Sequence, residues 1–269
     1  MADFIASNQY QATLARLANK LQSDLMNGQP AVIGISGAQG SGKSTLASAL
    51  VQFLRTQGIA AATVSLDDYY LSKTHRQQLA QTVHPLLAMR GVPGSHNIQQ
   101  AITDANTVLA GTPVSLPQFD KALDEPVAAL PAQQYRLLIV EGWCLGIKAQ
   151  SAAELNLPVN ALEAQQDKHA VWRYYVNAQL AGLYADYWRL LKPLIWLQAP
   201  DWDCVCRWRA KQEQQLWQRR GKGMNEQQLA HFMQTFQRLT QASWQQLPAV
   251  ADYIVRLDQQ QTPTLLTAD

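Results

Sequence analysis

The chain of 269 residues carries 22 Lys and Arg against 20 Asp and Glu, a formal net charge of +2, and 47% hydrophobic residues. This balance gives no reason to expect a nucleic-acid or membrane partner, and no run is long and apolar enough to cross a bilayer. The three cysteines form neither a disulfide framework nor a zinc pattern, and the N-terminus does not read as a signal peptide, so we expect a reduced, cytoplasmic protein.

The first half of the chain alternates between helix-like and strand-like patterns. Leucines at helical spacing predict a first helix, which Gly28 and Pro30 would end, and apolar runs such as AVIGIS predict buried strands. The stretch after the second strand is rich in proline and glycine, so we expect mostly loop with room for one short helix. The predicted elements are a helix at 7–27, a strand at 31–36, a helix at 43–58, a strand at 61–66, a mostly looped stretch at 67–97, a helix at 98–111 and an irregular stretch at 113–126.

The second half repeats this alternation. Asp201 is placed to cap a long helix, and Asn225 with Gln228 has the spacing of a capping box ahead of another helix. Strands that alternate with helices predict an α/β fold with a mainly parallel sheet flanked by helices. The predicted elements are a strand at 135–142, a helix at 177–191, a strand at 194–199, a helix at 201–220, a helix from 225 with the apolar face Leu229, Phe232, Met233, Phe236 and Leu239, and a last strand at 251–258.

The sequence GAQGSGKS, from Gly37 to Ser44, matches the Walker A pattern G-x-x-x-x-G-K-[ST], with the required strand before it and helix after it. Backbone N–H groups and the helix dipole surround phosphate oxygens in such a loop, its lysine reaches the β- and γ-phosphates, and its serine ligates Mg²⁺. We therefore expect ATP and Mg²⁺, against the alternative of a glycine-rich turn with an incidental lysine. The residues expected to bind the nucleotide are Gly37, Gly40, Ser41, Gly42, Lys43, Ser44 and Thr45.

Acidic residues stand at the ends of two further strands. The second strand ends in Asp67 and Asp68, and the third ends in Glu141. Ligands of open parallel sheets bind beyond the carboxyl ends of the strands, so these acids should share an edge with the phosphate loop. Glu141 then suits a Walker B-type Mg²⁺ site, against the alternative of a solvated strand end. Successive strand side chains point to opposite faces, so one aspartate should face the phosphate while the other caps a turn or meets a distant base.

The chemistry of phosphoryl transfer explains the need for one such acid. A carboxylate must accept the proton of the attacking hydroxyl, and Mg²⁺ and cations must neutralise the phosphoryl oxygens. A GTPase would instead carry D-x-x-G after its third strand and N-K-x-D further on. This chain has EGWC after the third strand, and its NKLQ lies upstream of the phosphate loop, so the pattern favours a kinase over a switch protein.

The chain contains, in this order, the segments GAQGSGKST, SLDDYYL, RGVPGSHN, LPQFDKA, IVEGWCLG and CRWRAKQE. In order and spacing they resemble the D-glycerate 3-kinase family, a branch of the P-loop kinases related to phosphoribulokinase, uridine kinase and pantothenate kinase. The resemblance covers residues 31–258, nearly the whole chain. It implies a three-layer P-loop fold and a single kinase domain over residues 1–269, with a helical lid or insertions within 144–192 and 201–245.

The resemblance also implies a reaction, the ATP-dependent phosphorylation of glycerate on its 3-hydroxyl. In the related kinases the first acid of an Asp-x-aromatic motif is the base, which makes Asp67 catalytic alongside Lys43. This chain departs from the plant-type pattern at two places. The plant-type pattern has an arginine and a tyrosine where this chain has Gln118 and Phe119, and a glycine-rich basic segment where this chain has LDEPVAA. The expected metal ligands are Ser44, Glu141 and Asp67.

A small hydroxy acid needs a cation for its carboxylate, and a guanidinium binds a carboxylate through two hydrogen bonds. Arg90 opens a loop bounded by glycines and proline and is the first candidate, against a surface or structural ion pair. His96 lies in the same loop, where a donor to substrate and a loop-stabilising histidine are equally open alternatives. The residues expected to bind substrate are Arg90, His96, Asp120 and Lys121.

Cations after the fourth strand could belong to a lid that meets the transferring phosphate, although a solvated helix face is the commoner role for any one of them. Two other functions stay open, namely the same chemistry on a sugar phosphate, nucleoside or pantothenate-like alcohol, and a non-catalytic ATP-binding regulator. The retained Asp67 argues against the regulator. The lid candidates are Arg207, Arg209, Arg219, Arg220 and Lys222.

Overall fold

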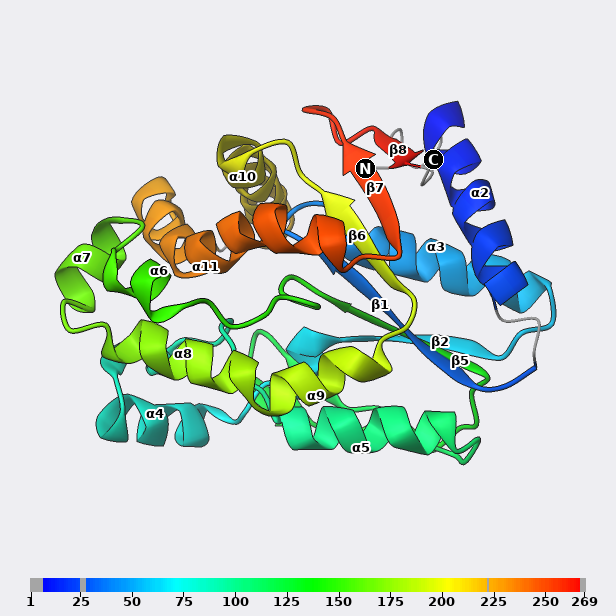
Figure 1. Ribbon diagram of the computed structural model, residues 1–269, viewed down its shortest axis with the longest axis horizontal. Helices are drawn as coiled ribbons and strands as arrows, with labels where there is room; N and C mark the ends of the chain where they lie inside the picture. Colours follow the sequence, from blue (N-terminus) through cyan, green and yellow to red (C-terminus); the bar gives the residue numbers. More distant parts are fainter. Residues whose placement is uncertain (1–6, 25–27, 222, 267–269) are drawn as a thin grey trace.

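A six-stranded sheet runs through the centre of the computed structural model, which describes residues 7–24, 28–221 and 223–266 (Figure 1). The strand order is β2-β5-β1-β6-β7-β8, and every neighbouring pair is parallel except β7 with β8. The expected α/β fold with a mainly parallel sheet is confirmed. The strands are β1 (Ala31–Gly37), β2 (Ala61–Ser65), β5 (Leu137–Gly142), β6 (Leu194–Gln198), β7 (Tyr253–Leu257) and β8 (Pro263–Leu266), with a separate hairpin of β3 (Gln118–Asp120) and β4 (Glu125–Val127).

Helices cover both faces of this sheet. No helix in the described part of the chain is long and apolar enough to span a membrane. The helices are α2 (Asn8–Asp24), α3 (Lys43–Thr56), α4 (Lys73–Thr82), α5 (Ile98–Leu109), α6 (Ala152–Asn156), α7 (Ala161–Gln166), α8 (Val171–Ala181), α9 (Leu183–Leu190), α10 (Trp202–Arg220) and α11 (Glu226–Gln246), with the 3₁₀ helices η1 (Leu66–Tyr69), η2 (Pro85–Ala88) and η3 (Leu247–Ala249).

The central strands contribute to two cores, one on each face of the sheet, because successive side chains point to opposite faces. In β5, Leu138 and Val140 pack into one core, and Leu137 and Ile139 pack into the other. Helices α5, α8 and α9 with the second half of α11 close the first core, whereas α2, α3 and the start of α10 close the second (Figure 1). The sheet is therefore the middle of three layers.

The capping signals in the sequence correctly mark helix starts. Asp201 caps α10 by accepting a hydrogen bond from the backbone N–H of Cys204 at 2.6 Å. Asn225 and Gln228 form the expected capping box at the start of α11. The first expected helix is present as α2, and the last three positions of its predicted range, 25–27, lie outside the described residues.

Three expectations are wrong in detail. The helix expected at 177–191 is two helices, because the chain breaks at Gly182 between α8 and α9. The stretch at 113–126 contains the β3–β4 hairpin, whose strands of three residues are too short to show an alternating pattern. The strand near residue 255 is not the last one, since β8 follows and pairs antiparallel with β7.

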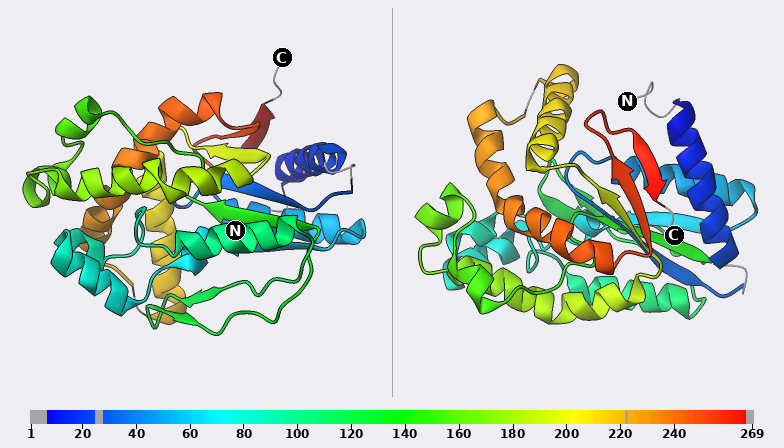
Figure 2. Two further views of the ribbon diagram at one scale, coloured as in Figure 1. Left: turned by 60° about the horizontal axis from the view of Figure 1, so that its bottom comes forward. Right: turned by 45° about the horizontal axis from the view of Figure 1, so that its top comes forward.

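Some elements lie outside the main layers. The β3–β4 hairpin stands apart from the six-stranded sheet (Figure 2, left). Helices α6 to α9 fall within residues 144–192, and α10 with most of α11 falls within 201–245. Their role as a lid, and the single-domain organisation over residues 1–269, stay predictions.

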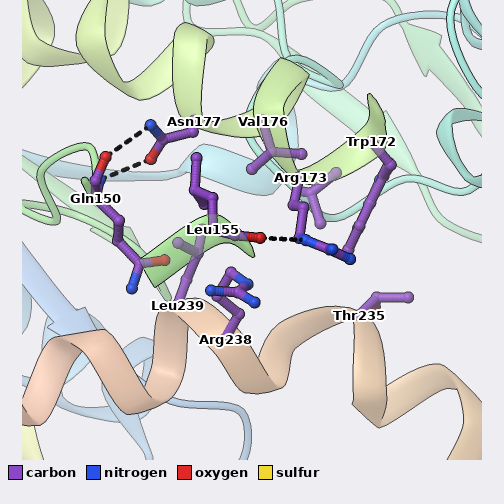
Figure 3. A pocket seen from close by; sticks show the side chains of 10 residues that line it. Gln150, Leu155, Trp172, Arg173, Val176, Asn177, Thr235, Arg238 and Leu239 are labelled. Atoms are coloured by element: carbon purple, nitrogen blue, oxygen red, sulfur yellow. Dashed lines mark hydrogen bonds between the residues drawn. The ribbon is translucent and has the colours of Figure 1, made fainter. Parts of the chain in front are cut away.

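A buried ion cluster joins the short helices to α11. It consists of Glu163 on α7, Asp167 after α7, Arg173 on α8 and Arg238 on α11. Arg238 pairs with Glu163 at 2.6 Å, and Arg173 pairs with Asp167 at 3.2 Å and donates to the carbonyl of Leu155 at 2.7 Å. Figure 3 shows the two arginines approaching each other from α8 and α11. Removal of one acid would therefore leave a guanidinium buried without its charge partner.

We expect Glu163→Gln to lower the free energy of unfolding by about 3 kcal/mol, because it leaves Arg238 as an uncompensated buried charge. Denaturant unfolding would measure this loss. The control is Asp186→Asn, which breaks an exposed ion pair with Arg189 and should cost less than about 1 kcal/mol. Equal small losses in the two variants would contradict the proposed importance of the cluster.

Candidate active site

The phosphate loop connects the end of β1 to the start of α3. Gly40 and Gly42 have φ of 78° and 86°, a left-handed conformation that favours glycine. A Cβ at Gly40 would also lie 2.7 Å from Cβ of Trp208 on α10, so a side chain is excluded there on two grounds. Gln261 donates a hydrogen bond to the carbonyl of Gly40 and ties the loop to the segment before β8. The loop is thus held in shape with the N-terminus of α3 open toward a ligand.

The carboxyl ends of β2, β5 and β1 lie side by side, as expected. In the parallel register, Glu141 of β5 is level with Ser65 of β2 and Ile35 of β1. Glu141 accepts a hydrogen bond from Ser44 Oγ at 2.9 Å, and its other oxygen, Oε2, lies 3.9 Å from Lys43 Nζ. The strand end and the phosphate loop therefore form one polar centre.

Ser44 and Glu141 suit a Mg²⁺ ion. Oε2 of Glu141 is buried and accepts no hydrogen bond, and the hydroxyl of Ser41 in the phosphate loop is likewise buried without a partner. Unsatisfied buried oxygens of this kind are costly unless a ligand is bound. Within the described residues no three His, Cys, Asp or Glu side chains form a metal cluster. Mg²⁺ does not require one, because it usually keeps several waters and binds through one or two carboxylates and the phosphates of its substrate.

The two adjacent aspartates have different surroundings. Asp68 closes the turn after β2, since its Oδ2 accepts a hydrogen bond from the Ser65 N–H at 2.9 Å within a capping box. The expectation that one aspartate caps a turn is therefore confirmed, and burial raises the pKa of Asp68. Asp67 instead reaches the cavity, where its Oδ2 pairs with Lys121 Nζ at 2.7 Å and its Oδ1 accepts from the Tyr70 hydroxyl at 2.8 Å.

The charge state of Asp67 is set by these neighbours. Burial by itself would raise the pKa of this carboxyl, but the Lys121 ammonium, helped by Lys43 and the Tyr70 hydroxyl, lowers it to about 2. Asp67 is therefore an ionised carboxylate at any physiological pH. Its negative charge is matched by the two lysines that border the same cavity.

Arg90 also lines the cavity, and three contacts hold its guanidinium in place. It forms an ion pair with Asp124, donates to the carbonyl of Lys121 at 3.3 Å and lies over the ring of Phe119 at 5.5 Å. Asp124 is held in turn by the buried Arg76 at 2.7 Å. Asp124 and Phe119 lie in the stretch where the chain departs from the plant-type pattern, so these departures shape the surroundings of Arg90.

A cavity of about 560 Å³ joins these groups, and it is large enough for a nucleotide and a small acceptor. It extends from the phosphate loop past the ends of β2 and β5 to α10 and α11. Of the residues expected to bind nucleotide, substrate or metal, those that line it are Gly40, Gly42, Lys43, Ser44, Thr45, Asp67, Arg90, Lys121 and Glu141. Gly37, at the end of β1, and Ser41, which is buried within the loop, do not line the cavity.

Two of the expected substrate residues do not line this cavity. His96 is buried, stacks on Tyr70 with ring centroids 4.6 Å apart, and bonds through Nδ1 to the Tyr184 hydroxyl at 2.7 Å. Burial lowers the pKa of His96 to about 4, although the charge of Asp67 acts in the other direction, so the ring is neutral. Asp120 accepts hydrogen bonds from two backbone N–H groups of the hairpin turn. The structure gives both side chains supporting contacts, and their expected role in substrate binding stays a prediction.

Sequence reasoning passed over several groups that the structure places at the site. Tyr70 holds Asp67 from only three positions along the chain, whereas Asp124 holds Arg90 from 34 positions away. Arg209 was one of several lid candidates, and among them it alone lines the cavity within the described residues. Its guanidinium pairs with the buried Glu213 one turn further along α10, at 2.6 Å.

The other lid candidates have different positions. Arg207 lies on α10 and donates to the sulfur of Cys204 at 2.8 Å. Arg219 and Arg220 end α10, and their side chains, like all of Lys222, are outside the described structure. Their expected contact with phosphate remains untested.

Comparison with known families supports a nucleotide-binding loop. Residues 6–72 match the family described as "Methylmalonyl Co-A mutase-associated GTPase MeaB". The match takes in the phosphate loop and β2 but stops before β5. The segment after β5 reads EGWC rather than the D-x-x-G of a GTPase, so the match supports the shared loop alone.

Whole-chain comparisons identify the wider group. The chain is 31% identical over 219 residues to "Uncharacterized kinase mug58" of Schizosaccharomyces pombe, an alignment that covers 77% of this chain and 78% of that protein. It is 26% identical over 221 residues to the chloroplastic D-glycerate 3-kinase of Arabidopsis thaliana, covering 77% of this chain and 46% of that protein. A solved structure of D-glycerate 3-kinase from Cryptococcus neoformans var. grubii has the same fold, with a TM-score of 0.75 and 21% identity, over 95% of this chain and 99% of that chain.

The fold and the site together define a P-loop kinase. The chain belongs to the family of P-loop kinases that includes the Schizosaccharomyces pombe kinase and the Arabidopsis thaliana D-glycerate 3-kinase. Kinases of this kind use ATP, so the cavity beside the phosphate loop is the candidate site for both the nucleotide and a small acceptor.

We expect Lys43→Ala to weaken binding of Mg-ATP by roughly ten-fold or more, because it removes the cation nearest the β- and γ-phosphates. Isothermal titration would measure the affinity, and a turnover assay should show little remaining activity. The control is Lys168→Ala, which removes an exposed lysine outside the cavity and should leave affinity unchanged. Wild-type affinity and turnover in a folded Lys43→Ala protein would overturn the assignment of the phosphate loop.

Proposed function

We propose that this protein transfers the γ-phosphate of ATP to the 3-hydroxyl of D-glycerate and forms 3-phosphoglycerate, with Mg²⁺ as cofactor. The observation that carries the proposal is the meeting of Asp67, Lys43 and Arg90 in one cavity beside the phosphate loop. A carboxylate, a phosphate-binding cation and a guanidinium are the three groups that phosphorylation of a small hydroxy acid needs. A cytoplasmic location, where Cys144, Cys204 and Cys206 stay as the free thiols observed, is part of the proposal.

The acceptor is proposed on two independent supports. One is the identity of the relatives, since a plant relative and a solved structure of the same fold are both D-glycerate 3-kinases. The other is charge: ATP brings several negative charges into the site, so an anionic acceptor requires basic residues beyond Lys43 and Mg²⁺. Arg90 and Lys121 supply two such cations on the wall of the cavity.

In the proposed reaction, Asp67 accepts the proton of the 3-hydroxyl while that oxygen forms a bond to the γ-phosphorus and the bond to the leaving ADP oxygen breaks. Lys43 and the backbone N–H groups of the phosphate loop neutralise the phosphoryl oxygens. Ser44 and Glu141 would hold Mg²⁺, which adds positive charge to the phosphates when bound. Arg209, on the α10 side of the cavity, is a further cation available to the phosphates.

An assay of ADP release across a panel of hydroxylated acceptors tests the function directly. The panel should contain D-glycerate, L-glycerate, glycerol, a pentose phosphate, a nucleoside and pantothenate. We expect D-glycerate to have the highest kcat/KM. A clear preference for another acceptor would redirect the proposal to that substrate, and no ADP release with any acceptor would favour a non-catalytic ATP-binding role.

We expect Asp67→Asn to lower kcat by about 10²–10⁴-fold, because loss of a general base affects the chemical step, while the affinity for ATP changes little. The matched control is Asp68→Asn, whose amide oxygen can still accept the hydrogen bond from Ser65. Steady-state kinetics of both variants would show the difference. A larger loss in Asp68→Asn than in Asp67→Asn would contradict the assignment.

We expect Arg90→Lys to raise KM for glycerate more than KM for ATP, because lysine keeps the charge but loses the planar pair of donors. Arg90→Ala should raise KM for glycerate further, by roughly ten-fold or more. If Arg90→Ala left this KM unchanged, recognition of the carboxylate would belong to another cation. Equal turnover of glycerol and glycerate by the wild-type protein would show that the carboxylate is not recognised at all.

A further inference from the structure

Both oxygens of the Asp67 carboxylate already have a hydrogen-bond donor. The Tyr70 hydroxyl donates to Oδ1 at 2.8 Å, and the Lys121 ammonium donates to Oδ2 at 2.7 Å. Lys121 and Tyr70 both line the cavity beside Asp67, so an acceptor hydroxyl that is to give its proton to Asp67 must approach past these two donors.

The two donors differ in how firmly they are held. Tyr70 is 6% exposed, stacks on His96 and meets the edge of Phe119 at 5.3 Å, so its hydroxyl cannot move away from Asp67 without disrupting buried packing. The Lys121 side chain is 59% exposed and belongs to the turn between β3 and β4. Of the two donors, Lys121 is therefore the one that can leave.

The backbone of the turn is fixed although the lysine side chain is exposed. Arg90 donates to the carbonyl of Lys121 at 3.3 Å, and Asp120 accepts from the next two backbone N–H groups at 2.7 and 3.0 Å. The side chain can thus rotate about a fixed backbone position. Arg90 also lines the cavity, so a carboxylate bound at Arg90 would lie within reach of the Lys121 ammonium.

The charge of the acceptor decides whether Lys121 moves. An acceptor with a carboxylate offers the ammonium a new negative partner and so replaces one ion pair by another. A neutral alcohol offers no such partner, so withdrawal of Lys121 would give up its ion pair with Asp67 without replacing it by another. An anionic acceptor can therefore uncover Asp67, and a neutral one cannot do so at the same cost.

We propose that Lys121 is a carboxylate-responsive gate on Asp67: the acceptor's carboxylate draws the ammonium away and opens the catalytic oxygen to the acceptor's hydroxyl. The inference rests on the proposed function and extends it. It states that the protein prefers hydroxy acids over neutral alcohols in the chemical step as well as in binding. Lys121 is then a specificity-determining residue for anionic acceptors of few carbons. Arg90 binds the carboxylate, whereas Lys121 responds to it.

The test compares D-glycerate with glyceramide, its uncharged amide of nearly equal size, in wild-type protein and in Lys121→Ala. We expect wild-type kcat to be much higher with D-glycerate. In Lys121→Ala, kcat with glyceramide should rise by roughly ten-fold, because Asp67 is no longer covered, while KM for D-glycerate rises as one cation is lost. An increase of kcat in a variant that lacks a cation is an outcome that a merely structural role would not produce.

Two control variants separate the gate from general effects. Lys148→Ala removes an exposed lysine outside the cavity and should change neither acceptor's kinetics. Arg90→Ala should raise KM for D-glycerate without raising kcat for glyceramide, because Arg90 does not contact Asp67. Circular dichroism and thermal unfolding should show that each variant is folded.

Each result has a distinct meaning. If a folded Lys121→Ala lowered kcat with both acceptors to the same extent, or left kcat with glyceramide unchanged, the gate would be wrong while the proposed function stood. If wild-type protein phosphorylated neither acceptor but used another one, the proposed function would fail, and the inference that rests on it would fail with it.

Discussion

The site depends on the parallel register of β2, β5 and β1, because it brings the carboxyl ends of three strands to one edge of the sheet. Parallel pairing is possible here because helices bury both faces of these strands, which leaves only their ends for polar groups. The phosphate loop, Asp67 and Glu141 all follow from this arrangement. A one-residue slip of β5 would turn Glu141 to the other face of the sheet.

The arrangement concentrates negative charge, and the chain places a cation beside three of the acids. Glu141 has Lys43, Asp67 has Lys121, and Asp124 has Arg90 with the buried Arg76. These pairs differ in exposure, since Arg76 is buried while Lys121 is largely exposed. The pairs nearest the cavity lie where phosphates and an anionic acceptor would bring further negative charge. On binding, the cations of these pairs can therefore turn from the acids to the ligand without becoming unpaired.

The helices that surround the cavity are held in place by ion pairs of their own. The helices α7, α8 and α11 are joined by buried ion pairs, and α11 contributes Phe232 and Phe236 to the wall of the cavity. On the other side, Glu213 fixes the direction of Arg209 within α10. The two helices that follow β6 therefore reach the cavity through groups whose orientation is already set by neighbours.

The local features could be predicted from the sequence. They are the phosphate loop, the strands that alternate with helices, the capping residues Asp201 and Asn225, and the different roles of Asp67 and Asp68. Each of these is written in residues close together in the chain, through helical or strand periodicity and glycine geometry. The partners of the side chains were decided by the tertiary structure. His96 and Asp120 contact other parts of the protein outside the cavity, Tyr70 lines the cavity beside Asp67, and Asp124 pairs with Arg90. The hairpin that carries Lys121 has strands too short to predict, and Lys121 lies 54 positions from Asp67, so only folding could reveal their pair.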